Sequence, residues 1–241
     1  MTELVTYSRS GPIASIVMDD GKANVMSLAM LNALHGAFDQ AENDKAVVIL
    51  KARGKHFSGG FDLSVFAKGS AEDQYLMVKT GAELALRILS FPMPVVAACQ
   101  GNAYPMGAFL IMSSDHRVAA EGDYRIGMNE VAIGLTVPRF AIEIARQRLT
   151  PAYFSRVVMT GEMFGPTEAV TAGFFDRVVP VDRLEQAAGE AALALSKLNM
   201  PAHAATKMRA RGAVITQIRQ VIDEDITPNY GEDRVARRVP A

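Results

Sequence analysis

The sequence predicts an α/β fold, because strand, loop and helix patterns follow one another along the chain. Apolar runs at residues 46–51 and 95–99 are expected to form buried strands. Each run is followed by a glycine-containing loop, at residues 54–60 and 101–107, and then by a helical pattern. A strand, loop and helix unit that occurs at least twice is typical of an α/β domain.

The other elements follow from their own local patterns. Residues 4–8 and 13–18 alternate on either side of Ser-Gly-Pro and predict a pair of strands. Ser27 is a candidate N-cap, because apolar residues follow it at helical spacing. Further helices are expected at residues 75–89, 108–113, 167–172, 183–198 and 201–225, with Gly212 as a weak point, and a last strand at residues 174–179.

A change in composition after Pro166 divides the chain. We place a boundary near Pro180, with a core at residues 1–180 and a helical region at residues 181–241. The alanine-rich helices of the second part are expected to pack on the core or on another subunit.

The composition excludes several classes of protein. The chain has 241 residues, 49% of them hydrophobic, and a formal net charge of −1. A charge so close to zero argues against nucleic acid or an anionic membrane as the main partner. We expect a soluble cytoplasmic protein, because residues 1–5 do not resemble a secretory signal and no apolar run reaches about 18 residues. The single cysteine, Cys99, lies in an apolar run and is expected in the core.

Two glycine-containing loops are candidate anion-binding segments. In the first, Ser58-Gly-Gly-Phe-Asp62, paired glycines allow successive N–H groups to point into one pocket. In the second, Tyr104-Pro-Met-Gly107, the loop opens a short helix whose free N–H groups favour negative charge. Taken alone, each loop is more typical of a plain turn or helix start. Together with a carboxylate downstream, they suggest an oxyanion hole.

That carboxylate is Glu130, in Ile126-Gly-Met-Asn-Glu130. A glutamate of unknown context is usually a surface residue in an ion pair. If Glu130 is catalytic, it needs an apolar wall that raises its pKa, so that its carboxylate is a competent base. The candidate wall residues are Phe109, Ile126, Met128, Val131 and Ile133.

These segments resemble the crotonase superfamily of enoyl-CoA hydratases and isomerases. The similarity covers nearly the whole chain in the right order, at residues 57–63, 101–115, 126–135, 151–161, 166–169 and 172–179. The resemblance implies a spiral of strand-strand-helix turns with a C-terminal helical trimerisation region. It also implies an acyl-CoA thioester substrate, no cofactor beyond the CoA of that substrate, and a homotrimer or a hexamer built as a dimer of trimers.

The resemblance assigns roles to individual residues. The thioester oxygen is expected to bind the N–H groups of Phe61 and Met106, or of Phe61 and Gly107 if the register differs by one. Met106 stands where the family usually has glycine. The CoA group is expected to lie against Lys22, Ala23, Asn24 and Gly59, although a solvated surface lysine is the simpler reading of Lys22.

One position selects among the reactions of the family. Hydratases of the superfamily carry a second glutamate where this chain has Phe109, and the two carboxyls orient a water. With Phe109 beside the substrate and Glu130 alone, the pattern resembles 3,2-enoyl-CoA isomerases that work with one glutamate. The alternatives are a 2-enoyl-CoA hydratase and a non-catalytic acyl-CoA-binding protein. Asp115 resembles the residue that ends this helix throughout the family.

The remaining polar residues suggest structural roles. The four histidines, His35, His56, His116 and His203, lack the spacing of metal ligands, so no metal site is expected. Ser58 is expected to cap its own loop and Asp62 the helix that follows. The cationic strip of Lys207, Arg209, Arg211 and Arg219 is expected to be a solvated helix face, or to supply one contact to a CoA phosphate. The apolar candidates for an acyl tunnel are Phe66, Met77, Phe109 and Phe140.

Overall fold

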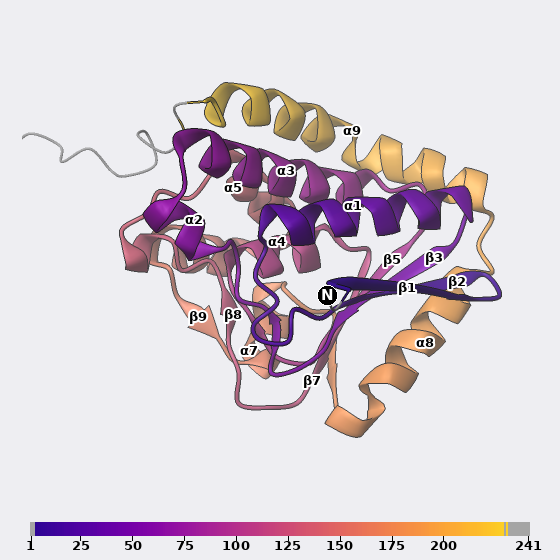
Figure 1. The fold of residues 1–241 in the computed structure, drawn as a ribbon. Helices are drawn as coiled ribbons and strands as arrows, with labels where there is room; N and C mark the ends of the chain where they lie inside the picture. Colours follow the sequence, from indigo (N-terminus) through magenta and orange to yellow (C-terminus); the bar gives the residue numbers. More distant parts are fainter. Residues whose placement is uncertain (1–2, 229, 231–241) are drawn as a thin grey trace, which may run out of the picture.

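The chain winds between two β-sheets, as seen in a computed structural model that describes residues 3–228 and 230 (Figure 1). The larger sheet has the strand order β1-β2-β3-β5-β7-β10 and the smaller sheet β4-β6-β8-β9. The strands of the larger sheet are β1 (Val5–Ser10), β2 (Ile13–Met18), β3 (Val47–Ala52), β5 (Val95–Cys99), β7 (His116–Ala120) and β10 (Arg177–Val179). Those of the smaller sheet are β4 (His56–Ser58), β6 (Asn102–Ala103), β8 (Ile126–Gly127) and β9 (Met163–Phe164).

Successive turns of the chain repeat one pattern, a strand in each sheet and then a helix. Strands β3, β5 and β7 lie parallel in the larger sheet, and β4, β6 and β8 lie parallel in the smaller one. The helical elements are α1 (Leu28–Asn43), α2 (Leu63–Lys68), α3 (Ala71–Ser90), α4 (Pro105–Ser113), η1 (Val131–Ile133), α5 (Arg139–Arg148), α6 (Pro151–Thr160), α7 (Pro166–Ala172), η2 (Val181–Arg183), α8 (Leu184–Leu195) and α9 (Met200–Asp225). The predicted α/β spiral of strand-strand-helix turns is therefore confirmed.

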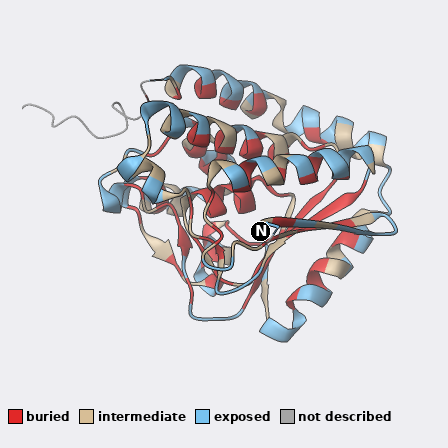
Figure 2. Ribbon diagram, in the orientation of Figure 1, coloured by how far each residue is buried: buried red, intermediate tan, exposed pale blue. Residues whose placement is uncertain are grey.

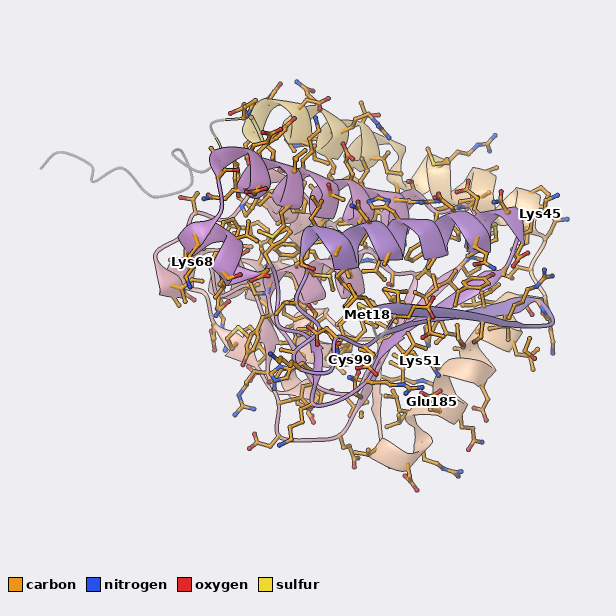
Figure 3. All side chains as sticks on the ribbon, in the orientation of Figure 1. Met18, Lys45, Lys51, Lys68, Cys99 and Glu185 are labelled. Atoms are coloured by element: carbon orange, nitrogen blue, oxygen red, sulfur yellow. The ribbon has the colours of Figure 1, made fainter. Side chains whose placement is uncertain are left out.

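Helices cover the larger sheet on both faces. Helices α1, α3, α4, α5 and α9 contact one another on one side, and α8 packs on β3, β5 and β7 from the other. Their inward faces are buried and their outward faces exposed (Figure 2). On the α8 side, Lys51 Nζ of β3 lies 2.6 Å from Glu185 Oε2 of α8 (Figure 3). The division of the chain at Pro180 stays a prediction.

Local signals place several helix starts. The Ser27 hydroxyl accepts a hydrogen bond from the Met30 N–H, and the Asp62 carboxylate accepts one from the Ser64 N–H, so both predicted caps are confirmed. Helix α3 begins earlier than expected, because Ser70 and Asp73 form a capping box. Helix α9 continues through Gly212 without a break.

The sequence-based prediction missed helices α5 and α6, strand β7 and most of the shortest elements. Strand β4 lies inside the segment expected to be a loop at residues 54–60, and β6, β8 and β9 were not expected at all. Two or three residues are too few to show an alternating pattern. The strand expected at residues 174–179 is only Arg177–Val179, because Phe174 and Phe175 are buried in the preceding turn.

Of the cations expected on a solvated face, Lys207 is buried and Arg211 is partly buried. Lys207 is 6% exposed, and its Nζ donates to Phe91 O at 2.7 Å and to Asp115 Oδ2 at 2.7 Å. Arg211 Nη1 lies 2.9 Å from Asp115 Oδ1. That expectation was wrong for these two residues, because α9 lies across the core and the cations meet a buried carboxylate. Arg209 and Arg219 are exposed as expected.

Cys99, labelled in Figure 3, lies in β5. It is fully buried, as predicted. Burial raises the pKa of its thiol to about 12, so the reactive thiolate is disfavoured. In the part of the chain that the structure describes, no helix is long and apolar enough to cross a bilayer.

Candidate active site

A cavity of about 520 Å³ lies where the parallel strands of the smaller sheet end. Four of the expected site residues line it: Ala23, Gly59, Phe61 and Glu130. The cavity is also lined by Val25, His56, Gly60, Asp62, Leu63, Ser64, Phe66, Val78, Tyr104, Pro105, Asn129, Ile133, Leu135, Thr136, Pro138 and Tyr230.

The loop after β4 is held rigidly in front of this cavity. The Ser58 hydroxyl donates to Asn24 O at 2.8 Å and accepts from Gly60 N at 3.1 Å, which confirms that it caps its own loop. Gly59 N donates to Ala23 O at 2.7 Å, and Gly60 has a φ of 85°, a backbone conformation that favours glycine. Within the described part of the chain, the Phe61 N–H has no hydrogen-bond partner, so it is available to a ligand.

The second candidate donor lies at the start of α4. The helix begins at Pro105, three residues before the expected start, with Tyr104 as its N-cap. Pro105 has no N–H, so Met106 carries the first N–H of the helix, and that N–H has no acceptor within the helix. A Cβ on Gly60 would lie 3.6 Å from Pro105 N, so the two donor segments lie side by side.

Side-chain packing explains why the residue at 106 need not be glycine. Met106 is fully buried, and its methyl group lies beside Gly81 and the Phe61 ring. Its side chain therefore packs in the core, and the residue is not among those that line the cavity. Gly107 serves close packing, since a Cβ there would lie 2.8 Å from Ser58 Cβ.

Glu130 is a titratable group in an unusual, buried environment. Its residue is 6% exposed, and Oε2 has no hydrogen-bond partner among the described residues. Burial raises the pKa of this carboxyl from its ordinary 4.5 to about 7. The loop is held by the Ile133 and Leu135 N–H groups, which both donate to Glu130 O, at 3.0 and 2.9 Å.

The wall around Glu130 differs in part from the expected one. Ile126 and Met128 are fully buried, and Ile133 lines the cavity although it is 49% exposed. Val131 is 44% exposed and is not among the residues that line the cavity, because η1 turns it away from the pocket. Phe109 is fully buried and is not among the lining residues either.

Phe109 lies one helical turn behind Pro105 and packs against Phe140 of α5. The two rings meet edge to face, with centroids 5.6 Å apart. Of the acyl-tunnel candidates, only Phe66 lines the cavity, while Met77, Phe109 and Phe140 are core residues. The position at 109 is thus filled by an apolar ring packed in the core.

One other carboxylate among the described residues lines the cavity, and it already accepts hydrogen bonds. Asp62 Oδ1 accepts hydrogen bonds from Ser64 N at 2.9 Å and from Ser64 Oγ at 2.7 Å. This carboxylate caps α2. Glu130 is therefore the lining carboxyl that keeps one oxygen, Oε2, without a partner among the described residues.

The segment expected to bind CoA divides between the surface and the core. Lys22 is exposed, and Ala23 lines the cavity. Asn24 is buried, and its amide donates to Arg53 O at 2.9 Å and to His56 O at 2.8 Å. The Asn24 side chain thus holds the loops together. Its backbone has a positive φ of 51°.

Several residues that line the cavity were not predicted from the sequence. His56 and Tyr104 flank the two donor loops, and their ring centroids lie 6.4 Å apart. Their positions in the sequence next to those loops could have indicated that they line the cavity. No sequence pattern near Tyr230 predicted that it lines the cavity. Among residues 3–228 and 230, no group of three histidine, cysteine or acidic side chains is arranged to hold a metal ion.

Comparison with known proteins identifies the family. The model of the enoyl-CoA hydratase/isomerase family matches residues 8–227. A probable enoyl-CoA hydratase of Bacillus subtilis is 35% identical over 170 residues, which are 67% of this chain and 63% of that protein, so the match spans less than two thirds of the relative.

Solved structures of two proteins are also similar. A Mycobacterium tuberculosis protein, described in one structure as an enoyl-CoA isomerase and in another as a probable enoyl-CoA hydratase, has a TM-score of 0.88 at 43% identity, and the isomerase structure covers 92% of this chain and 97% of that one. Human mitochondrial delta3-delta2-enoyl-CoA isomerase has a TM-score of 0.91 at 25% identity, covering 97% and 92%. The chain belongs to the enoyl-CoA hydratase/isomerase family, within the crotonase superfamily.

Proposed function

We propose that the protein is an enoyl-CoA isomerase that moves the double bond of a 3-enoyl-CoA to the 2-position. The observation that carries this proposal is the buried Glu130, whose Oε2 accepts no hydrogen bond from the described residues and whose carboxyl has a pKa raised to about 7. A carboxyl with a pKa near neutrality is suited both to remove a proton and to return it.

The reaction needs one acid-base group and one site for negative charge. The Glu130 carboxylate removes a proton from C2, and the electron pair moves onto the thioester oxygen to form a dienolate. The N–H groups of Phe61 and Met106 would stabilise that oxygen, each by about 3 kcal/mol of barrier. The protonated Glu130 then delivers the proton to C4, and the double bond forms between C2 and C3.

The environment of the carboxyl supports this reaction over hydration. Addition of water needs a second group to orient it, and Phe109 offers none. Asp62, the other carboxylate of the described lining, already caps α2. The similar structures include ones described as isomerases and ones described as hydratases, so the preference rests on Glu130 and on the residue at 109.

We propose that the CoA group of the substrate lies where the resemblance to the family implies. The CoA group would lie on the side of Lys22, Ala23 and Gly59, with Asn24 holding the loop rather than touching the ligand. No cofactor beyond CoA is required. A homotrimer or hexamer also stays a proposal, supported by the exposed apolar residues Val131, Ile133 and Met159 on η1 and α6.

Ultraviolet assays separate the candidate functions. We expect the purified protein to form a conjugated 2-enoyl-CoA from a 3-enoyl-CoA. Consumption of a 2-enoyl-CoA alone, with uptake of water, would instead identify a hydratase, as the similarity to the Bacillus subtilis protein would suggest. Binding of acyl-CoA without turnover of either substrate would identify a non-catalytic family member.

A further inference from the structure

The helical side of the cavity is lined largely by apolar residues that come from distant segments. Phe66 comes from α2, Val78 from α3, Leu135 and Pro138 from the segment after η1, and Tyr230 from the chain after α9. Tyr230 is 7% exposed and belongs to the main hydrophobic core. On the strand side, the cavity is lined by Ala23, Gly59 and His56.

The end of α9 is fastened to the segments that carry two of these apolar residues. Asp225 Oδ2 accepts a hydrogen bond from Arg139 N at 2.9 Å, directly after Pro138. Asp223 Oδ1 lies 3.6 Å from Lys79 Nζ, directly after Val78. A third contact joins Glu224 Oε2 to Arg139 Nη1 at 2.9 Å. The last turn of α9 is thereby held against both α3 and the start of α5.

The chain beyond α9 then turns inward towards the cavity. Ile226 is 1% exposed, and its N–H donates to Ile222 O at 3.0 Å. Tyr230 N donates to Thr227 O at 2.8 Å, which closes a turn. The position of Tyr230 is thus fixed by local hydrogen bonds and by the three contacts of α9 with its neighbours.

We propose that Tyr230 is the end wall of the acyl-binding side and sets the longest acyl chain that the site accepts. This proposal rests on the proposed function only in that the substrate is an acyl-CoA with its thioester between Phe61 and Met106. An acyl chain that grows away from the thioester along Phe66 and Val78 gains apolar contact with each methylene. Once it reaches Tyr230, which is packed in the core, the described residues offer further methylenes no continuation of the cavity.

Equilibrium binding of saturated acyl-CoAs tests the wall, because these ligands undergo neither isomerisation nor hydration. We expect the affinity of the unaltered protein to rise up to about fourfold per added methylene and then to stop rising. In Tyr230→Ala the rise should continue for several more methylenes, so that the longest chains bind at least about tenfold more tightly than to the unaltered protein. Butyryl-CoA should bind both proteins within about twofold.

Tyr230→Phe is the matched control, since it keeps the ring and should keep the original length limit. Tyr230→Val is a second, smaller truncation if the alanine variant does not fold. An unchanged limit in the folded truncated variant overturns the proposal, as does an equal loss of affinity at every chain length. If the length limit shifts in a protein that has no isomerase activity, the role of Tyr230 is supported and only the proposed reaction is refuted. If the protein is an isomerase and the limit does not shift, the proposed reaction is supported and the role of Tyr230 is refuted.

Discussion

Two carboxylates near opposite ends of α4 show how the same chemical group is put to different uses. Asp115, just beyond the C-terminal end, is paired with Lys207 at 2.7 Å and Arg211 at 2.9 Å, and also accepts a hydrogen bond from Val95 N at 2.8 Å. Glu130 lies in the cavity that the N-terminal end lines, and its Oε2 has no such partner among the described residues. Both are largely buried, so the difference lies in their partners.

The comparison teaches which carboxylate stabilises the fold and which one is available for chemistry. Paired charges hold α9 on the core, and removal of one member leaves the others uncompensated. An unpaired buried carboxyl instead destabilises the fold when it ionises, and it is retained where proton transfer needs it. The following predictions test this contrast, beginning with the largest effect.

Glu130→Gln should abolish isomerase activity without preventing folding. Because Glu130 supplies both proton transfers, we expect kcat to fall by about 10⁴-fold, which corresponds to about 5.5 kcal/mol of barrier. Single-turnover assays with a 3-enoyl-CoA measure the loss. Glu190→Gln on the exposed side of α8 is the matched control and should retain full activity. A rate for Glu130→Gln within tenfold of the unaltered enzyme would refute the catalytic role.

Asp115→Asn should destabilise the protein without a specific effect on proton transfer. It removes the negative charge that Lys207 and Arg211 share, and we expect a loss of about 4 kcal/mol in the free energy of unfolding. Urea denaturation measures this loss. Glu185→Gln is the control, because its pair with Lys51 is solvent-exposed on the glutamate side and should contribute less than about 1 kcal/mol. Equal losses in the two variants would show that burial does not distinguish these pairs.

The raised pKa of Glu130 should make stability depend on pH. Below about 4.5 the carboxyl is protonated in both states, and between about 4.5 and 7 it ionises in the unfolded chain first. Unfolding therefore becomes easier as pH rises through this window, by a total of about 3 kcal/mol. Relative to Glu130→Gln, the unaltered protein should lose that amount between pH 4.5 and 7.5. A constant difference between the two denaturation profiles would show that the pKa is not raised.

Much of the fold could be predicted from local patterns, and the limits of that prediction have physical causes. The caps Ser27 and Asp62 act within three residues, so the sequence alone identifies them. Strands β6 and β8 are only two residues long, and their positions depend on pairing with distant segments. The burial of Lys207 depends on Asp115, 92 residues away, and no local pattern encodes that contact.

The candidate site shows the same division. Ser58, Gly59 and Phe61 lie together in sequence, so their shared loop could be recognised from the chain alone. The exposure of Val131 depends on the turn of η1, and the place of Phe109 behind Pro105 depends on the packing of α4 against α5. Tyr230 reaches the cavity only because α9 ends between α3 and α5, which no motif near Tyr230 reveals.

The central claim is that one carboxyl carries the same proton from C2 to C4. The most direct measurement uses a 3-enoyl-CoA deuterated at C2 and follows the label in the product by mass spectrometry and nuclear magnetic resonance. We predict a 2-enoyl-CoA that carries deuterium at C4 in a measurable fraction of molecules. A product with no deuterium at C4, or a 3-hydroxyacyl-CoA formed only from a 2-enoyl substrate, would contradict a single-carboxyl shuttle at Glu130.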